Sequence, residues 1–136
     1  MNDGHRRIDR LELCAIAIGG AVGALGRVGL SRAFPAAPGS WPWVTFTINL
    51  AGAFMLGWFV TRLQERLPLS TLRRPLLATG LCGTFTTFST VQVEVLLMID
   101  RHRDGLALGY MAASVSGGFL LVLLASALVR RVRVIA

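Results

Sequence analysis

Hydroxyl side chains gather in the middle of an apolar stretch of this chain. Five of the seven residues from Thr84 to Thr90 are Ser or Thr, and they lie within the apolar run from Leu76 to Ile99. A run of this length can span a bilayer, since roughly 20 apolar residues suffice. Hydrocarbon is a poor environment for hydroxyl-rich or irregular backbone, so protein or water must surround this cluster.

The same stretch is predicted to interrupt its helix. Gly80 and Gly83 stand just before the hydroxyl residues, and Gly has no preference for the helical conformation. Thr is stiff at its β-carbon, and its hydroxyl competes for backbone carbonyls. We therefore expect a break near Gly83 to Thr87, where freed carbonyls could bind a cation or freed N–H groups an anion. A kinked helix packed by small residues is the alternative.

Three further polar residues lie in apolar surroundings. Asn49, in the middle of its apolar block, either joins helices through its amide or offers its NH₂ group to a desolvated anion. Thr45, one turn earlier on the same face, would add a hydroxyl. Glu94 lies one turn after Thr90. A carboxylate at that depth is a candidate for a functional site, although a water-filled vestibule would remove most of its energetic cost.

Two other apolar blocks carry candidates as well. Arg27 is the only charge well inside the first block, one turn after Gly23, which belongs to a G-x-x-x-G pair suited to close helix contact. Its guanidinium either reaches the membrane interface or raises the local anion concentration at a pore mouth. Tyr110 and Ser114, one turn apart in the last block, form a polar stripe that lines a cavity or packs against another helix.

Four apolar blocks must position these residues. Among 136 residues, 54% are hydrophobic and 15% are charged, and most charges fall between the blocks. This pattern predicts an all-α integral membrane protein with one domain and four transmembrane helices. The predicted spans cover residues 11–33, 43–63, 76–99 and 105–129.

The composition argues against other classes of protein. The net charge of +7 could suit nucleic acid, but the arginines lie at span ends rather than along one face. We expect no enzyme, because no nucleophile, metal cluster, P-loop lysine or nucleotide motif is readable. Cys14 and Cys82 fall inside apolar spans, where we expect small, buried packing residues.

Three segments of the sequence resemble a known family. GGAVGALGR in the first span, INLAGAF in the second and GLCGTFTTFST in the third are similar to the fluoride channels of the Fluc (CrcB) family. The resemblance covers all four spans in order. It implies a fluoride-selective channel in the cell membrane, formed by an antiparallel dimer, through which passive efflux lowers cytoplasmic fluoride. It also implies a structural sodium ion at the dimer interface, held by backbone carbonyls at the break.

The resemblance implies roles for individual residues. The sodium-binding carbonyls fall on Gly83 and Thr86. Phe88 takes the place of the first pore phenylalanine, whose electropositive ring edge faces the anion. Asn49 matches the pore amide, and Arg27 matches the vestibule arginine. The other pore candidates are Glu94, Tyr110 and Ser114, with Thr45 beside Asn49.

Two positions depart from the family pattern, and two other classes stay open. Val91 stands where a second phenylalanine is usual, and Gly118 stands where a hydroxyl residue continues the stripe. A four-span, proton-coupled multidrug exporter would need an embedded carboxylate in its first span, where Glu12 sits only at the entrance. A structural subunit without transport would need only the small-residue packing faces.

The arginines predict an orientation for the chain. Three of them, Arg32, Arg101 and Arg103, flank one side, and this bias places both termini in the cytoplasm. A homodimer of dual topology would need nearly balanced ends, so the bias and Val91 together suggest an oppositely oriented homologue as partner. A homodimer stays the simpler expectation. The ten arginines on the side of the termini are Arg6, Arg7, Arg10, Arg62, Arg66, Arg73, Arg74, Arg130, Arg131 and Arg133.

Overall fold

The computed structural model describes residues 10–65 and 72–131, and all regular structure in these ranges is helical. Four helical stretches are long and apolar enough to cross a membrane. They are Arg10–Ala33, Trp43–Gln64, Pro75–Asp100 and Asp104–Arg131. The prediction of an all-α protein with four membrane spans is therefore confirmed. Four arginines of the orientation argument lie outside the described residues, namely Arg6, Arg7, Arg66 and Arg133.

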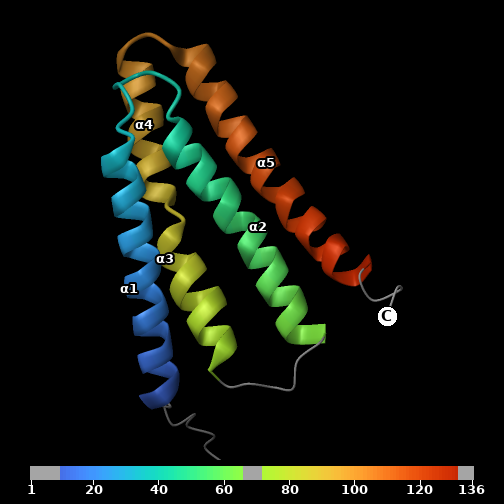
Figure 1. Cartoon of the computed structure of the whole chain (residues 1–136). Helices are drawn as coiled ribbons and strands as arrows, with labels where there is room; N and C mark the ends of the chain where they lie inside the picture. The colour runs from blue at the N-terminus through green and yellow to red at the C-terminus, as the bar shows by residue number, and fades with distance from the viewer. Residues whose placement is uncertain (1–9, 66–71, 132–136) are drawn as a thin grey trace, which may run out of the picture.

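Three of the spans are continuous helices, and the third is divided (Figure 1). The continuous helices are α1 (Arg10–Ala33), α2 (Trp43–Glu65) and α5 (Asp104–Arg131). The divided span begins as a π-helix, η1 (Pro75–Cys82), and continues as the short α3 (Gly83–Phe85). Thr86 and Thr87 are then extended, with φ/ψ of −77°/155° and −147°/118°, before α4 (Phe88–Asp100) begins. Both extended residues lie inside the stretch where the sequence favoured a break.

Helix α1 lies along the first half of the divided span, because glycines remove the side chains that would separate the two helices (Figure 1). A Cβ atom on Gly19 would overlap the carbonyl oxygen of Leu76. In the other direction, a Cβ atom on Gly80 would lie 2.6 Å from the carbonyl oxygen of Ile16. Gly23 makes a similar approach to α3. The small-residue face of the first span is thus a contact between backbones.

The core sits where α4, α5 and the start of α2 meet. Its buried cluster consists of Val91, Met98, Ala107 and Tyr110. The Trp41 ring packs edge-on against Tyr110, with ring centroids 5.4 Å apart. This cluster holds α4 against α5 near the end of the molecule where the chain turns between these two helices (Figure 1).

Much of the apolar surface faces outward, as in helices that contact lipid or another subunit. Leu108, for example, is 73% exposed. Soluble proteins rarely leave such continuous apolar surface uncovered. Cys82 is buried as expected, but the expectation for Cys14 was wrong, because this residue is exposed. The buried face of α1 runs through Ala15 and Gly23 instead.

Candidate functional site

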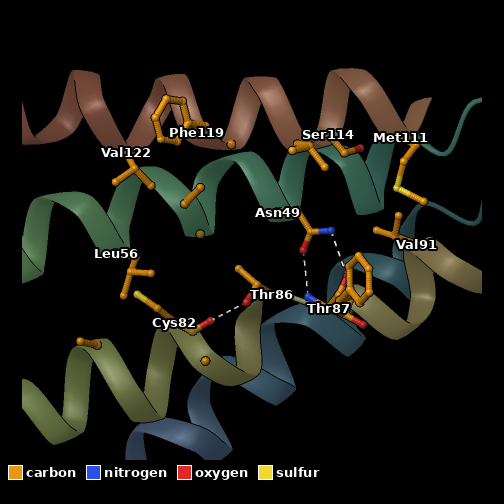
Figure 2. Close-up of a pocket in the computed structure, with 17 residues that line it drawn as sticks. Asn49, Leu56, Cys82, Thr86, Thr87, Val91, Met111, Ser114, Phe119 and Val122 are labelled. Atoms are coloured by element: carbon orange, nitrogen blue, oxygen red, sulfur yellow. Dashed lines mark hydrogen bonds between the residues drawn. The ribbon is translucent and has the colours of Figure 1, made fainter. Parts of the chain in front are cut away.

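Asn49 on α2 binds the backbone of the break through both polar atoms of its amide (Figure 2). Its Nδ2 donates to the carbonyl oxygen of Thr87 at 3.0 Å, and its Oδ1 accepts from the N–H of Thr87 at 2.8 Å. One side chain therefore satisfies an N–H and a C=O group of the extended segment. Nδ2 carries a second proton, which makes no hydrogen bond within the described chain. The amide thus joins helices and still keeps one donor for a ligand.

Because Thr86 and Thr87 are extended, two carbonyl groups lose the N–H donors that a continuous helix would give them. In a continuous helix, the N–H of Thr87 would donate to the Gly83 carbonyl, but it donates to Asn49 instead. Likewise, the N–H of Thr90 would donate to the Thr86 carbonyl, but it donates to the Thr87 hydroxyl at 3.3 Å. A Cβ atom on Gly83 would meet nothing within 4 Å, so the space beside this residue is open. The two carbonyls lose these helical donors at a place that a ligand could reach.

Arg27 on α1 holds a third carbonyl of the break. Its Nε donates to the carbonyl oxygen of Thr84 at 3.0 Å, and the Thr84 hydroxyl donates to the carbonyl of Gly20 at 2.8 Å. In a continuous helix the N–H of Phe88 would serve the Thr84 carbonyl, but Phe88 lies beyond the extended pair. From the sequence, the Arg27 guanidinium could have reached either the membrane interface or a pore mouth. The structure places its guanidinium against the break.

A groove of about 370 Å³ opens beside the break and is walled by the divided span, α2 and α5 (Figure 2). Asn49, Thr87 and Ser114 gather toward one end of it, and Phe119 and Val122 lie toward the other (Figure 2). Phe88, which is 65% exposed, also lines the groove, as do Gly83 and Thr86. The groove thus brings together five of the residues that the sequence nominated: Asn49, Gly83, Thr86, Phe88 and Ser114.

Ser114 contributes a second donor to the groove. Its Oγ is buried and makes no well-formed hydrogen bond within the described chain. The hydroxyl of Tyr110 is its polar neighbour; that group donates its own proton to Glu94, and its oxygen can still accept from Ser114. An acceptor bound in the groove would compete with Tyr110 for the Ser114 proton.

Glu94 lies outside the groove in a hydrogen-bonded set with α2 and α5. Thr45 Oγ1 donates to Glu94 Oε1 at 2.5 Å, and the Tyr110 hydroxyl donates to Oε2 at 2.8 Å. Thr45 and Glu94 line a second hollow of about 270 Å³ beside the connection between α1 and α2, whereas Tyr110 is fully buried. The Thr45 proton is therefore committed to the carboxylate and is not offered to an anion beside Asn49. Water can reach Glu94 from the second hollow, as a vestibule position requires.

The two positions that depart from the family pattern also line the groove. Val91 is only 3% exposed and belongs to the buried core cluster, so its side chain serves packing first. A Cβ atom on Gly118 would have one neighbour within 4 Å, the Cβ of Ala53 at 3.9 Å. Gly118 therefore leaves the groove wide at this point.

Sequence reasoning missed two residues that build the site. Thr87 accepts from Asn49 through its carbonyl and donates to it through its N–H, and it caps α4; its hydroxyl lies 2.9 Å from that of Thr90. Gly52 allows the break to pack on α2, because a Cβ atom there would overlap Cγ2 of Thr86. Thr is a favoured N-cap residue, so the role of Thr87 at the start of α4 could have been recognised from the sequence. The contact between Gly52 and Thr86 could be seen only in the structure.

Comparisons with known proteins identify the family of this chain. Residues 14–126 match the family described as CrcB-like protein, Camphor Resistance (CrcB). The chain is 57% identical over 126 residues to the fluoride-specific ion channel FluC 1 of Mycolicibacterium paratuberculosis, a match that covers 93% of this chain and 96% of that protein. It is 56% identical to FluC 1 of Mycobacterium bovis, with the same coverage, and 40% identical to FluC 2 of Geobacillus kaustophilus, with 78% and 83% covered. Because the family match extends from α1 into α5, the chain belongs to the CrcB family.

Proposed function

We propose that this chain forms a fluoride-selective channel through which fluoride leaves the cytoplasm passively. The groove carries the proposal, because it presents two neutral donors, the second Nδ2 proton of Asn49 and the hydroxyl of Ser114. The ring of Phe88 lines the same space. The relatives that are named fluoride-specific ion channels support fluoride as the ion.

The chemistry of the groove suits an anion that must shed water. Fluoride is small and strongly hydrated, so a dry, selective passage must replace its water with hydrogen-bond donors. An amide N–H and a hydroxyl are neutral donors of this kind, and an aromatic ring presents an electropositive edge. Most of the remaining lining is apolar. An anion therefore has few places to bind, and they are neutral, so it can also leave.

We propose that an antiparallel copy closes the groove. A groove open on one side cannot exclude water, and a four-helix unit leaves little room for an internal pore. Val115 and Phe119, both on the groove, are 64% and 65% exposed, so a second subunit would bury apolar surface there. Self-association in antiparallel orientation gives two equivalent grooves that are related by a twofold axis.

The proposed dimer also gives a role to the freed carbonyls. The carbonyls of Gly83 and Thr86 have lost their helical donors, and the space at Gly83 is open. Hard cations prefer oxygen ligands, and two carbonyls from each of two copies would supply four. These residues therefore fit a structural sodium ion between the subunits. Such an ion would satisfy carbonyls that are costly to leave unpaired inside a membrane.

The role of Phe88 can be tested by removing its ring. Phe88→Leu keeps an apolar side chain but lacks the electropositive edge, so we expect fluoride efflux from liposomes to fall by about tenfold, or about 1.4 kcal/mol. Leu120→Ala, at a 62% exposed residue that does not line the groove, is the control and should conduct normally. Equal flux from Phe88→Leu and the unaltered chain would remove Phe88 from the ion path.

Orientation decides whether the partner is a second copy. In a background without Cys14 and Cys82, single cysteines introduced near each end of the chain would be labelled with a reagent that does not cross membranes. For a homodimer we expect labelling from both sides, because each copy inserts either way. Labelling from the cytoplasmic side alone would support the arginine bias and an oppositely oriented homologue as partner.

A proton-coupled exporter fits the structure less well. Its mechanism needs a carboxylate inside the first span. Glu12 is exposed in the first turn of α1, and Glu94, which lines the second hollow, belongs to α4 rather than to the first span. A purely structural subunit would leave the groove and the unused amide proton of Asn49 without a role.

A further inference from the structure

We infer that Arg27 is a positioning residue for the cation site at the break, because it takes the Thr84 carbonyl out of that site. This inference rests on the sodium site proposed above and adds a residue from α1 to it. It differs from a vestibule role, in which the charge of Arg27 would act on the anion from a distance. Here its hydrogen bond acts on the backbone that binds the cation.

The carbonyl groups of the break differ in whether a side chain donates a hydrogen bond to them. The Thr87 carbonyl accepts from Asn49, and the Thr84 carbonyl accepts from Arg27. The Gly83 and Thr86 carbonyls have lost the helical donors that would serve them. Two side chains from two different helices therefore select which carbonyls stay available. Arg27 acts on the α1 side of the break, and Asn49 acts on the α2 side.

The positive charge of Arg27 is also favourable beside the C-terminal end of η1 and α3. The carbonyls at the end of η1 and α3 carry the partial negative charge of a helix C-terminus, so a cation is stabilising there. The Thr84 hydroxyl ties the same residue to Gly20, and the glycine at position 23 lets α1 approach it closely. The segment is thus anchored to α1 by a side-chain hydrogen bond in each direction. Rigid anchoring keeps ligand atoms in place before the ion arrives.

Two effects of Arg27 on a bound cation oppose each other. Its positive charge repels a cation, whereas its hydrogen bond fixes the segment that holds the ligands. A hydrogen bond from a charged donor is stronger than one between neutral groups, and leaving the Thr84 carbonyl unpaired adds a further penalty. The polar groups around the break weaken the repulsion between the Arg27 charge and the bound cation. We therefore expect the hydrogen bond to dominate.

The test measures sodium binding without measuring transport. The thermal unfolding temperature of the purified dimer is followed while sodium replaces choline at constant ionic strength. Arg27→Met, which has neither charge nor donor, should raise the half-saturating sodium concentration about tenfold, or about 1.4 kcal/mol. Arg27→Gln keeps a neutral donor and should stay within about threefold of the unaltered chain. Arg32→Met, an exposed arginine in the last turn of α1, should show no change.

The outcomes separate this inference from the proposals beneath it. A sodium-responsive chain whose Arg27→Met variant binds sodium equally or more tightly would overturn the role of Arg27 alone. A chain indifferent to sodium would overturn the cation site and this inference together, while fluoride flux would still test the channel. If Arg27→Met does not form the dimer, proton exchange measured by NMR on the unaltered chain provides the test. The Nε proton of Arg27 should then exchange slowly with water, and exchange as fast as that of Arg32 would contradict the inference.

Discussion

Asn49→Ala should reduce fluoride efflux by about a hundredfold or more while the protein elutes from a sizing column at the same volume as the unaltered chain. The substitution removes both hydrogen bonds to Thr87 and leaves a backbone N–H and a C=O unpaired beside the groove. Each such group costs about 1–3 kcal/mol, and about 2.7 kcal/mol corresponds to a hundredfold change. The groove also loses the unused amide proton of Asn49. Efflux from liposomes with matched protein content measures the effect.

Thr47→Ala is the matched control for this experiment. Thr47 lies on α2 two residues before Asn49, and it is exposed and lines neither hollow. Its removal should leave efflux unchanged. Asn49→Asp tests the NH₂ group apart from the amide oxygen, because a carboxylate still accepts from the Thr87 N–H but cannot donate to the Thr87 carbonyl or to an anion. Normal flux in Asn49→Ala would show that the amide neither shapes the break nor lines the path.

Gly23→Ala should destabilise the fold strongly, although alanine is the better helix former. A Cβ atom at this position would overlap the carbonyl oxygen of Leu81 and the hydroxyl of Thr84, and it would lie 3.0 Å from the N–H of Phe85. Two of these atoms are backbone, so no rotamer change can relieve the overlap, and α1 must move away. Overpacking of this kind costs about 1–3 kcal/mol or more. Thermal unfolding and size exclusion in detergent should show a lower unfolding temperature and loss of the dimer.

Gly29→Ala provides the opposite expectation on the same helix. A Cβ atom there would meet nothing within 4 Å, so only the helix preference of alanine remains, worth up to about 1 kcal/mol. We expect unchanged or slightly higher stability. Equal stability of Gly23→Ala and Gly29→Ala would mean that α1 does not lie against α3 as described.

The spans and the region of the break were predictable because their signals are local. Long apolar runs bounded by arginines and prolines mark the four helices. Gly83 and the hydroxyl residues after it weaken the helix where the backbone is extended. The π-helical form of η1 was not predicted, because no signal in its sequence distinguishes it from an α-helix.

The partners of the polar residues depended on contacts distant in sequence. Asn49 and Thr87 are 38 residues apart, and Arg27 and Thr84 are 57 apart. From spacing alone, Asn49 could have joined helices or bound an anion, and the structure shows the first role while leaving a donor for the second. Thr45 was expected to face an anion, but its hydroxyl donates to a carboxylate.

Fluoride efflux from liposomes that contain only this chain tests the central claim most directly. Liposomes loaded with potassium fluoride and potassium chloride are diluted into an external solution without either anion, a potassium ionophore balances charge, and selective electrodes follow both anions. We expect rapid loss of fluoride, retention of chloride, and no dependence on a proton gradient. Fluoride release no faster than from empty liposomes, equal release of chloride, or transport that requires a proton gradient would contradict the account.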